Sequence, residues 1–368
     1  YNYGSQLQSY ASLITLQEMG YDVKIIKYKK KLTISFIFKS IPRIFNLSFV
    51  RRRIKIYHNK LLIRTNKLYS QVISNRNKQF DRFIRENFKK YVVESYGYHQ
   101  LKNDAKNYQA IVVGSDQLWL PSGMASNFYN LLFVPDEIKK VSFSTSFGVS
   151  NIPEYQKRKT KFYLERFSSI GVREDAGKTI VEELTNKKAV VTIDPTMMLD
   201  ADKWDEKIGS RIIKDKYIFC YFLGSNSQYR EKVKEFAEKN NIKVINLAYV
   251  DQYVESDNYF NNIENVGPFE FVNLVKNAEY IFTDSFHGSV FSVVYQKKFI
   301  VFNRFNDRDN NSRNSRIDNL TKMLGLEDRR YNGNIEDVFK TIDYESVLNQ
   351  LELERRKTRE FLKNALSC

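Results

Sequence analysis

The clearest candidate for chemistry is His287, one of only three histidines in the chain. It lies in the run Asp-Ser-Phe-His-Gly-Ser at 284–289, between an apolar stretch typical of a strand and a stretch typical of a helix. An imidazole there can exchange a proton near neutral pH, and a helix N-terminus favours an anion. A lone histidine is more often structural, but this setting favours function. We predict that His287 is catalytic and that Ser285, Gly288 and Ser289 bind an anionic donor.

A carboxylate, an amide and an aromatic ring follow a second apolar stretch, in the run Ser-Asp-Gln-Leu-Trp at 115–119. Carbohydrate sites combine such groups, because polar atoms bond hydroxyls and rings pack on apolar sugar faces. Asp116 is a candidate general base for an acceptor hydroxyl, and Ser115, Gln117 and Trp119 are candidate acceptor contacts. The alternative is that Asp116 caps the next segment and Trp119 belongs to the core.

Two polar turns precede predicted helices, at residues 2–6 and 224–226. A glycine in each turn lets backbone N–H groups approach a ligand. The candidates are Asn2, Gly4 and Gln6 for the acceptor, and Gly224, Ser225 and Asn226 for the donor. A plain turn and an ordinary helix N-cap remain equally open for these two segments.

Three arginines are candidate partners for an anionic donor. Arg173 follows the predicted strand at 169–172 and precedes a helix, a position from which a guanidinium can clamp a carboxylate or phosphate. The alternative is a surface salt bridge to Glu174 or Asp175. Arg304 and Arg316 fall in a polar stretch that we expect to be a loop over the cleft, where solvated charge is the favoured interpretation.

The alternation of apolar strands and amphipathic helices predicts an α/β fold with parallel sheets. We expect two Rossmann-like domains in a GT-B-like arrangement, with ligands at the carboxyl ends of the strands. The predicted units are residues 1–205 on the acceptor side, 206–343 on the donor side and a closing helix at 344–368. Strands are predicted at 22–28, 110–113, 141–147, 169–172, 189–193, 217–223, 243–247, 280–283 and 298–302.

Composition indicates a globular, cytoplasmic protein: 42% of residues are hydrophobic, 28% are charged, and no run of 18 apolar residues predicts a membrane span. Cys220 and Cys368 form no disulfide framework and no metal cluster, so we expect a reducing compartment and no required metal. The sequence begins at Tyr1, and we expect a strand to precede it.

The net charge of +16 is concentrated in one segment. Residues 24–102 contain 21 Lys and Arg against three acidic residues, so the remainder is close to neutral. We interpret residues 29–102 as a basic helical insertion. A solvated face is the favoured interpretation, a peripheral contact with an anionic membrane the second, and nucleic-acid binding is not expected.

Together these motifs resemble the polysaccharide pyruvyl transferase family. The matching runs are residues 2–8, 113–119, 146–148, 171–175, 193–196 and 283–288, in the order of the family. Some members carry an arginine two residues before the histidine, and here that position is Ser285.

The resemblance implies a transferase that moves a pyruvyl group from phosphoenolpyruvate, a co-substrate, to a sugar of a bacterial surface polysaccharide, capsule or precursor. It implies that Arg173 and His287 bind or activate phosphoenolpyruvate, and that other cations replace the arginine missing at 285. A lipid-linked saccharide acceptor would fit the basic, apolar segment. The alternatives are a GT-B glycosyltransferase that uses a nucleotide sugar, and a membrane-associated binding protein without catalysis.

Overall fold

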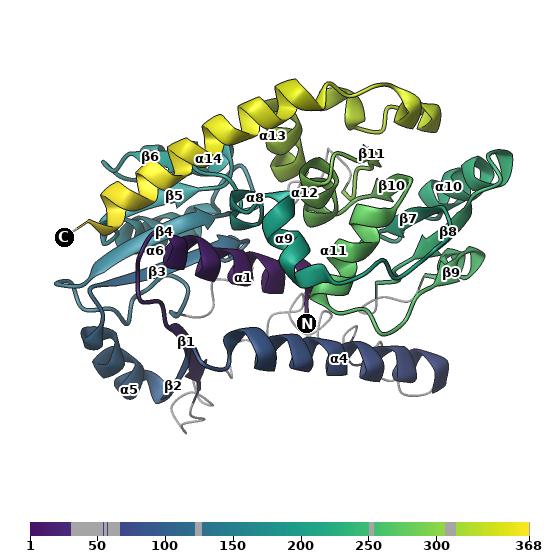
Figure 1. The fold of residues 1–368 in the computed structure, drawn as a ribbon. Coiled ribbons are helices and arrows are strands. Elements are labelled where there is room, and N and C mark those ends of the chain that lie inside the picture. Colours follow the sequence, from purple (N-terminus) through teal and green to yellow (C-terminus); the bar gives the residue numbers. More distant parts are fainter. Residues whose placement is uncertain are drawn as a thin grey trace.

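The computed structural model describes residues 1–30, 54, 57, 67–121, 127–249, 254–305 and 314–367. Two parallel sheets with flanking helices form two halves (Figure 1). The first sheet has the order β3 (Ala110–Asp116), β4 (Lys139–Thr145), β5 (Ser169–Val172), β6 (Ala189–Val191). The second has the order β11 (Lys298–Val301), β10 (Tyr280–Thr283), β7 (Tyr217–Tyr221), β8 (Lys243–Asn246), β9 (Asn261–Asn262). A separate parallel pair consists of β1 (Ile25–Lys29) and β2 (Val92–Tyr96).

Helices connect the strands in the order expected for βαβ units. They are α1 (Tyr3–Glu18), α4 (Lys67–Phe88), α5 (Gly97–Asp104), α6 (Glu154–Glu165), α7 (Asp175–Leu184), α8 (Pro195–Met198), α9 (Ala201–Ile208), α10 (Ser227–Lys239), α11 (Pro268–Asn277), α12 (Phe286–Val294), α13 (Ser315–Met323) and α14 (Tyr344–Leu366). Short 3₁₀ turns lie at Ala105–Asn107, Glu255–Tyr259, Glu327–Arg329 and Ile335–Phe339.

The second sheet is doubly wound around its first strand. The chain passes from β7 outward through β8 and β9, and then crosses to β10 and β11 on the other side. The strand order therefore reverses between β7 and β10, and a ligand crevice is expected at the carboxyl ends of these two strands. The predicted α/β fold with two Rossmann-like halves is confirmed, while the predicted domain boundary at 205/206 stays a prediction.

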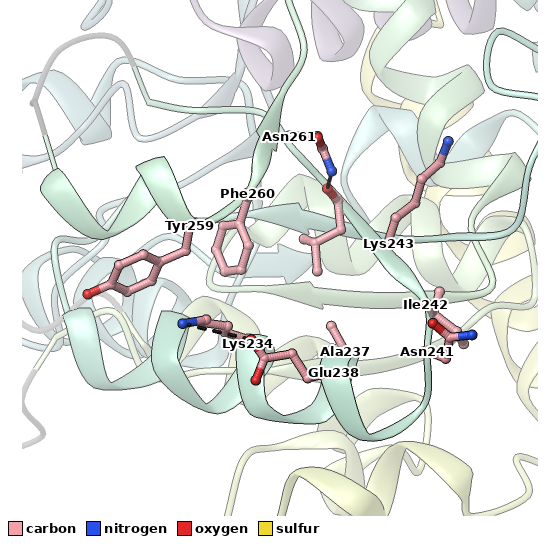
Figure 2. A pocket seen from close by; sticks show the side chains of 10 residues that line it. Lys234, Ala237, Glu238, Asn241, Ile242, Lys243, Tyr259, Phe260 and Asn261 are labelled. Atoms are coloured by element: carbon pink, nitrogen blue, oxygen red, sulfur yellow. Dashed lines mark hydrogen bonds and ion pairs between the residues drawn. The ribbon is translucent and has the colours of Figure 1, made fainter.

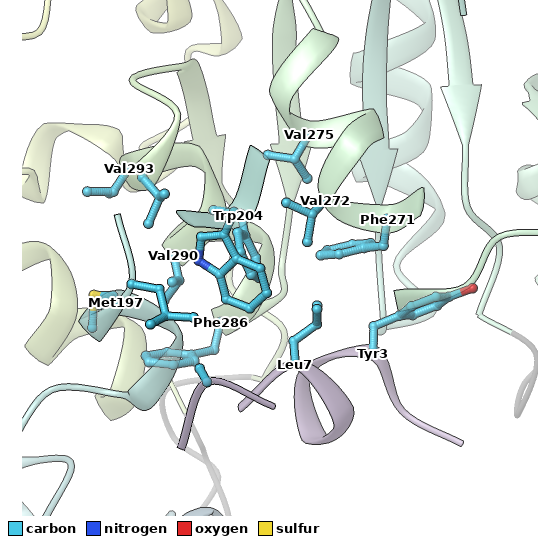
Figure 3. Packing of buried hydrophobic residues seen from close by; sticks show 14 of the residues in the cluster. Tyr3, Leu7, Met197, Trp204, Phe271, Val272, Val275, Phe286, Val290 and Val293 are labelled. Carbon is cyan, nitrogen blue, oxygen red and sulfur yellow. The ribbon is translucent and has the colours of Figure 1, made fainter. Parts of the chain in front are cut away.

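One hydrophobic core joins the two halves (Figure 3). Tyr3 and Leu7 of α1 pack with Trp204 of α9 and Phe271 of α11 in this cluster. The helix predicted at the C-terminus is α14, which runs back to the first half (Figure 1). There its Thr358 hydroxyl accepts a hydrogen bond of 3.2 Å from the backbone N–H of Ile193.

The basic segment is only partly described, because most of residues 31–66 lie outside the described part of the chain. Its C-terminal portion forms α4, which is helical as predicted, and the strand β2, which was not predicted. Phe80 and Phe83 of α4 are buried in the shared core, and Arg76 donates a 3.1 Å hydrogen bond to the carbonyl of Tyr1. Helix α4 is therefore part of the folded body. In the described residues, no helix combines the length and apolarity that a membrane span requires.

Candidate active site

The predicted chemical residues meet where the carboxyl ends of the two sheets face each other. Asp116 ends β3, Arg173 follows β5, and Asp194 follows β6. His287 lies in the first turn of α12, immediately after β10. Close contacts between charged or polar groups connect the four side chains. The site is therefore completed only by both halves, which is the GT-B-like arrangement expected from the sequence.

Asp194 is the centre of the site's hydrogen bonds and is fully buried. Its Oδ2 forms an ion pair with Arg173 Nη2 at 2.7 Å and accepts from Ser115 Oγ at 3.0 Å, and its Oδ1 accepts from Thr196 N at 3.0 Å. Burial alone would raise the pKa of Asp194, but the Arg173 guanidinium, His287 and the Thr196 hydrogen bonds outweigh burial and lower it. Asp194 is therefore an ionised carboxylate that fixes Arg173. Sequence reasoning missed this role, although the Asp-Pro pair after a short strand was a usable signal.

His287 is held between this carboxylate and helix α1. Its Nε2 lies 3.8 Å from Asp194 Oδ1 and has no hydrogen-bond partner among the described residues. On the other edge, Gly4 packs so closely that a Cβ there would lie 2.0 Å from His287 Nδ1. Burial lowers the pKa of His287 below its usual 6.5, although Asp194 and Asp116 oppose the shift. The imidazole is therefore neutral at pH 7, and its buried Nε2 has unused hydrogen-bonding capacity.

Asp116 lies between two arginines. Its Oδ1 is 3.7 Å from Arg173 Nη1 and 3.8 Å from Arg316 Nη1, and its Oδ2 accepts a 3.0 Å hydrogen bond from Ser5 Oγ. Burial opposes ionisation, but Arg173, His287 and Arg316 outweigh it and lower the pKa of Asp116 to about 2. The carboxylate is charged at neutral pH and is a weak base while both arginines face it. Its role as general base stays a prediction.

Two buried groups in this site have unused hydrogen-bonding capacity. Arg173 is 4% exposed, yet its Nε and Nη1 donate no hydrogen bond within the described residues. The guanidinium groups of Arg173 and Arg316 lie 4.7 and 5.7 Å from the ring centre of Phe286. Buried donors without acceptors are rare and mark places where an unseen partner binds. Arg173 and His287 therefore combine buried hydrogen-bonding groups that are suited to an anion.

The position of Arg316 corrects the expectation of a solvated loop arginine. Residue 316 lies in the first turn of α13, and its side chain is 11% exposed. Residues 306–313 of the predicted loop lie outside the described part. Arg304 is partly buried near Tyr249 and Phe305 instead. Arg316, not Arg304, therefore faces Asp116.

The salt-bridge alternative for Arg173 is also excluded by its neighbours. Glu174 points away to the loop after β4, where its Oε1 accepts from Ser146 Oγ at 2.8 Å and from the N–H of Phe147 at 3.1 Å. This carboxylate fixes the loop carrying the Ser-Phe-Gly run. Arg173 is thereby left to Asp194 and Asp116.

Two predicted acceptor contacts are structural. Trp119 is fully buried against Phe147 and Phe167, so the prediction that its ring packs on a sugar is wrong. Ser115 is also fully buried, and its N–H donates a 2.8 Å hydrogen bond to Gln8 Oε1. Gln8 is a positioning residue that sequence reasoning missed, because a contact across 107 residues leaves no local signal.

The two polar turns act as helix caps. Asn2 accepts from Ser5 N at 3.0 Å and caps α1, and Asn226 accepts from Gln228 N at 3.0 Å and caps α10. Gly224 N donates at 2.7 Å to Asp284 Oδ2, so this amide is occupied. Ser225 is exposed, Gln6 and Gln117 are partly buried, and the structure assigns these three side chains no role at the site.

The predicted helix terminus after β10 is built as expected. Ser285 caps α12 by accepting from Gly288 N at 3.3 Å, and Ser289 Oγ donates to the Ser285 carbonyl at 3.0 Å. A Cβ at Gly288 would lie 2.6 Å from Thr283 Oγ1, so only glycine fits there without displacement. These residues position His287, and their contact with a donor stays a prediction.

A surface hollow lies elsewhere, between α10 and the strands β8 and β9 (Figure 2). Lys234, Tyr259 and Phe260 line it together with Asn261. None of the predicted site residues belongs to its lining. Among the described residues, no group of three or more His, Cys, Asp and Glu side chains is placed to hold a metal ion, and metal independence stays a prediction.

Comparison with known families decides the relationship. A family model named polysaccharide pyruvyl transferase matches residues 2–306. The chain belongs to this family. The match covers every motif of the site from Asn2 to Arg304, and membership makes the protein a transferase with a saccharide acceptor. Arg316 lies outside the matched residues.

Comparisons with individual proteins give only distant similarities. No curated protein matches the chain. Among solved structures, it is similar to UDP-GlcNAc 2-epimerase from Neisseria meningitidis bound to UDP-GlcNAc, with 11% identity, a TM-score of 0.48 and 96% of each chain covered. It is also similar to the UDP-GlcNAc 2-epimerase from Methanocaldococcus jannaschii, with 15% identity, a TM-score of 0.41, and 72% of this chain and 78% of that chain covered. Structural similarity this low does not indicate a function for this chain.

The contact between Gly4 and His287 generates a first prediction. Gly4→Ala must displace the imidazole, because the new Cβ would lie 2.0 Å from its Nδ1. We expect about a 100-fold loss of transferase activity from this misplacement, and a shifted imidazole signal in NMR spectra of the three-histidine chain. The matched control is Gly177→Ala in α7, where the nearest atoms are 3.4 Å away. Equal effects of the two substitutions would contradict the assignment.

Proposed function

We propose that the protein transfers the pyruvyl group of phosphoenolpyruvate to two hydroxyls of a sugar in a surface polysaccharide or its precursor, forming a ketal. The observation that carries the proposal is the unsatisfied Arg173 and His287 pair at the junction of the two halves. Phosphoenolpyruvate presents a carboxylate and a phosphate, the groups that a guanidinium fork binds best. The site therefore combines an anion clamp with a proton carrier.

The reaction requires a proton to be added to the methylene carbon of the donor. His287 is the proposed acid, since its buried Nε2 has no hydrogen-bond partner among the described residues. The resting imidazole is neutral, and a bound dianionic donor raises its pKa because nearby negative charge favours the protonated form. Protonation leaves an electron-poor carbon that one sugar hydroxyl attacks.

The remaining steps release phosphate and close the ring. The first hydroxyl forms a C–O bond as its proton passes to a base, for which Asp116 is the candidate. The C–O bond to phosphate then breaks with its electrons on the leaving group, which takes the proton held by Asp116. The second hydroxyl forms the other ketal bond as its proton passes to the neutral His287 imidazole. Arg173 and Arg316 are placed to stabilise the charge of the departing phosphate.

Arg316 is the proposed substitute for the arginine that other family members carry at the position of Ser285. Its guanidinium and that of Arg173 lie near the same Asp116 oxygen, at 3.8 and 3.7 Å. A donor oxyanion near that oxygen would meet both cations. The glycosyltransferase alternative is less well supported, because it needs the Gly224 turn for a diphosphate and that amide is bonded to Asp284.

The reaction itself can be tested directly. We expect phosphate release from phosphoenolpyruvate that depends on a saccharide acceptor, together with a pyruvyl mass gain on that acceptor. His287→Gln should lower the rate by about 10²- to 10⁴-fold, the usual contribution of a general acid. His99→Gln, at an exposed position on α5, is the control. Stabilisation by nucleotide sugars without any phosphate release would favour the glycosyltransferase alternative.

The lowered pKa of His287 predicts a pH profile. If the acid form is required, kcat/KM for phosphoenolpyruvate falls as pH rises past a free-enzyme pKa below 6.5. The corresponding limb of kcat should lie at higher pH, because the bound donor raises the pKa of the imidazole. Rate measurements across pH for wild type and His287→Gln provide the check. The proposal fails if the variant keeps the same limb, or if the kcat limb lies at lower pH.

The role of Arg316 predicts a selective loss of donor affinity. Arg316→Met should raise KM for phosphoenolpyruvate at least about tenfold, since hydrogen bonds to charged groups contribute about 1.5–3 kcal/mol. Arg316→Lys should be intermediate, and Arg304→Met should change KM less. Steady-state kinetics at saturating acceptor measures all three. An unchanged donor KM in Arg316→Met, or a larger rise in Arg304→Met, would remove Arg316 from the donor site.

A further inference from the structure

Helix α6 carries a row of exposed aromatic and basic side chains that the proposed reaction does not use. Tyr155, Arg158, Lys159 and Phe162 follow the spacing i, i+3, i+4, i+7 and therefore share one face of the helix. All four are exposed, and Tyr155 and Phe162 reach 84% and 59%. We call these four residues the α6 stripe.

The fold does not need this stripe. The opposite face of α6 supplies the packing through Thr160, Tyr163 and Leu164, which are buried. Single exposed aromatics are common on proteins, but two aromatics that flank two cations along one helix face form a continuous amphipathic surface. The composition of the stripe therefore requires an explanation outside the core.

The two cations of the stripe are electrostatically uncompensated. The neighbouring Lys157 and Lys161 pair with Glu154 at 2.7 Å and Glu165 at 3.7 Å. By contrast, Arg158 and Lys159 have no carboxylate within 4.0 Å in the described part of the chain. The stripe thus presents two positive charges between two rings.

We propose that the α6 stripe docks on the surface of an anionic lipid bilayer. Aromatic rings favour the boundary between headgroups and acyl chains, and nearby lysines and arginines are attracted to anionic headgroups. This inference does not depend on the proposed function, and it places a membrane contact outside the basic segment at 29–102.

Sedimentation with vesicles tests the proposal. The full chain should bind vesicles containing phosphatidylglycerol and fail to bind pure phosphatidylcholine vesicles. Arg158→Ser with Lys159→Ser should weaken binding about 30-fold, since each basic residue contributes about 1 kcal/mol near an anionic surface. Tyr155→Ser with Phe162→Ser should weaken it further. Turnover of a soluble acceptor should not change, because no stripe residue contacts the site.

A matched control separates the stripe from general charge. Ile212→Ser, Lys214→Ser, Lys216→Ser and Tyr259→Ser together remove two exposed apolar and two basic side chains from the second half. This variant should bind vesicles as wild type does. The proposal is overturned if the control loses as much affinity as the stripe variant, or if wild type binds neither vesicle. It is also overturned if the stripe substitutions abolish self-association in light scattering and leave vesicle binding intact.

Discussion

The geometry of the site depends on the burial of one charged carboxylate, that of Asp194. A buried charge is tolerated only when it is paired and hydrogen-bonded, and Asp194 satisfies this condition through Arg173, Ser115 and Thr196. Ser115 belongs to β3, Arg173 follows β5, and Thr196 lies in α8 directly after the carboxylate. The ion pair that stabilises the Asp194 carboxylate therefore also fixes the direction of the Arg173 guanidinium. The Nε and Nη1 groups of Arg173 are left without a hydrogen-bond partner among the described residues.

The second half completes this arrangement through a close backbone contact. His287 reaches Asp194 because α12 begins directly after β10, and Gly4 allows α1 to lie against the imidazole ring. Helix α1 belongs to the core that both halves share, so the ring is positioned by packing as well as by charge (Figure 3). Helix α14 returns across the first half and ties the end of the chain to the strand edge near Ile193. Core packing and helix contacts thus position His287 and the end of the first sheet.

The sequence predicted those parts that local patterns determine. Parallel strands place their following residues at one edge of a sheet, which is why His287, Asp116 and Arg173 could each be assigned to a strand end, while their common role was implied by the family resemblance. It could not predict side-chain direction, so Trp119 was assigned to a sugar although its ring belongs to the core. It also could not predict partners distant in the chain. Asp194 and Arg316 reach the site through tertiary contacts, so the sequence could list Arg316 as a candidate but could not show that it faces Asp116 or that Asp194 holds Arg173.

The low pKa of Asp116 determines the order of donor binding and acceptor activation in the proposed reaction. While Arg173 and Arg316 face this carboxylate, it is too weak a base to take a proton from a sugar hydroxyl. A donor anion bound by the same arginines shares their positive charge and adds negative charge of its own, and both effects raise the pKa of Asp116. Donor binding therefore strengthens the base and at the same time increases the protonated fraction of His287, since the pKa of His287 rises for the same reason. In this scheme the acceptor is activated only after phosphoenolpyruvate occupies the site, which limits loss of the reactive intermediate to water.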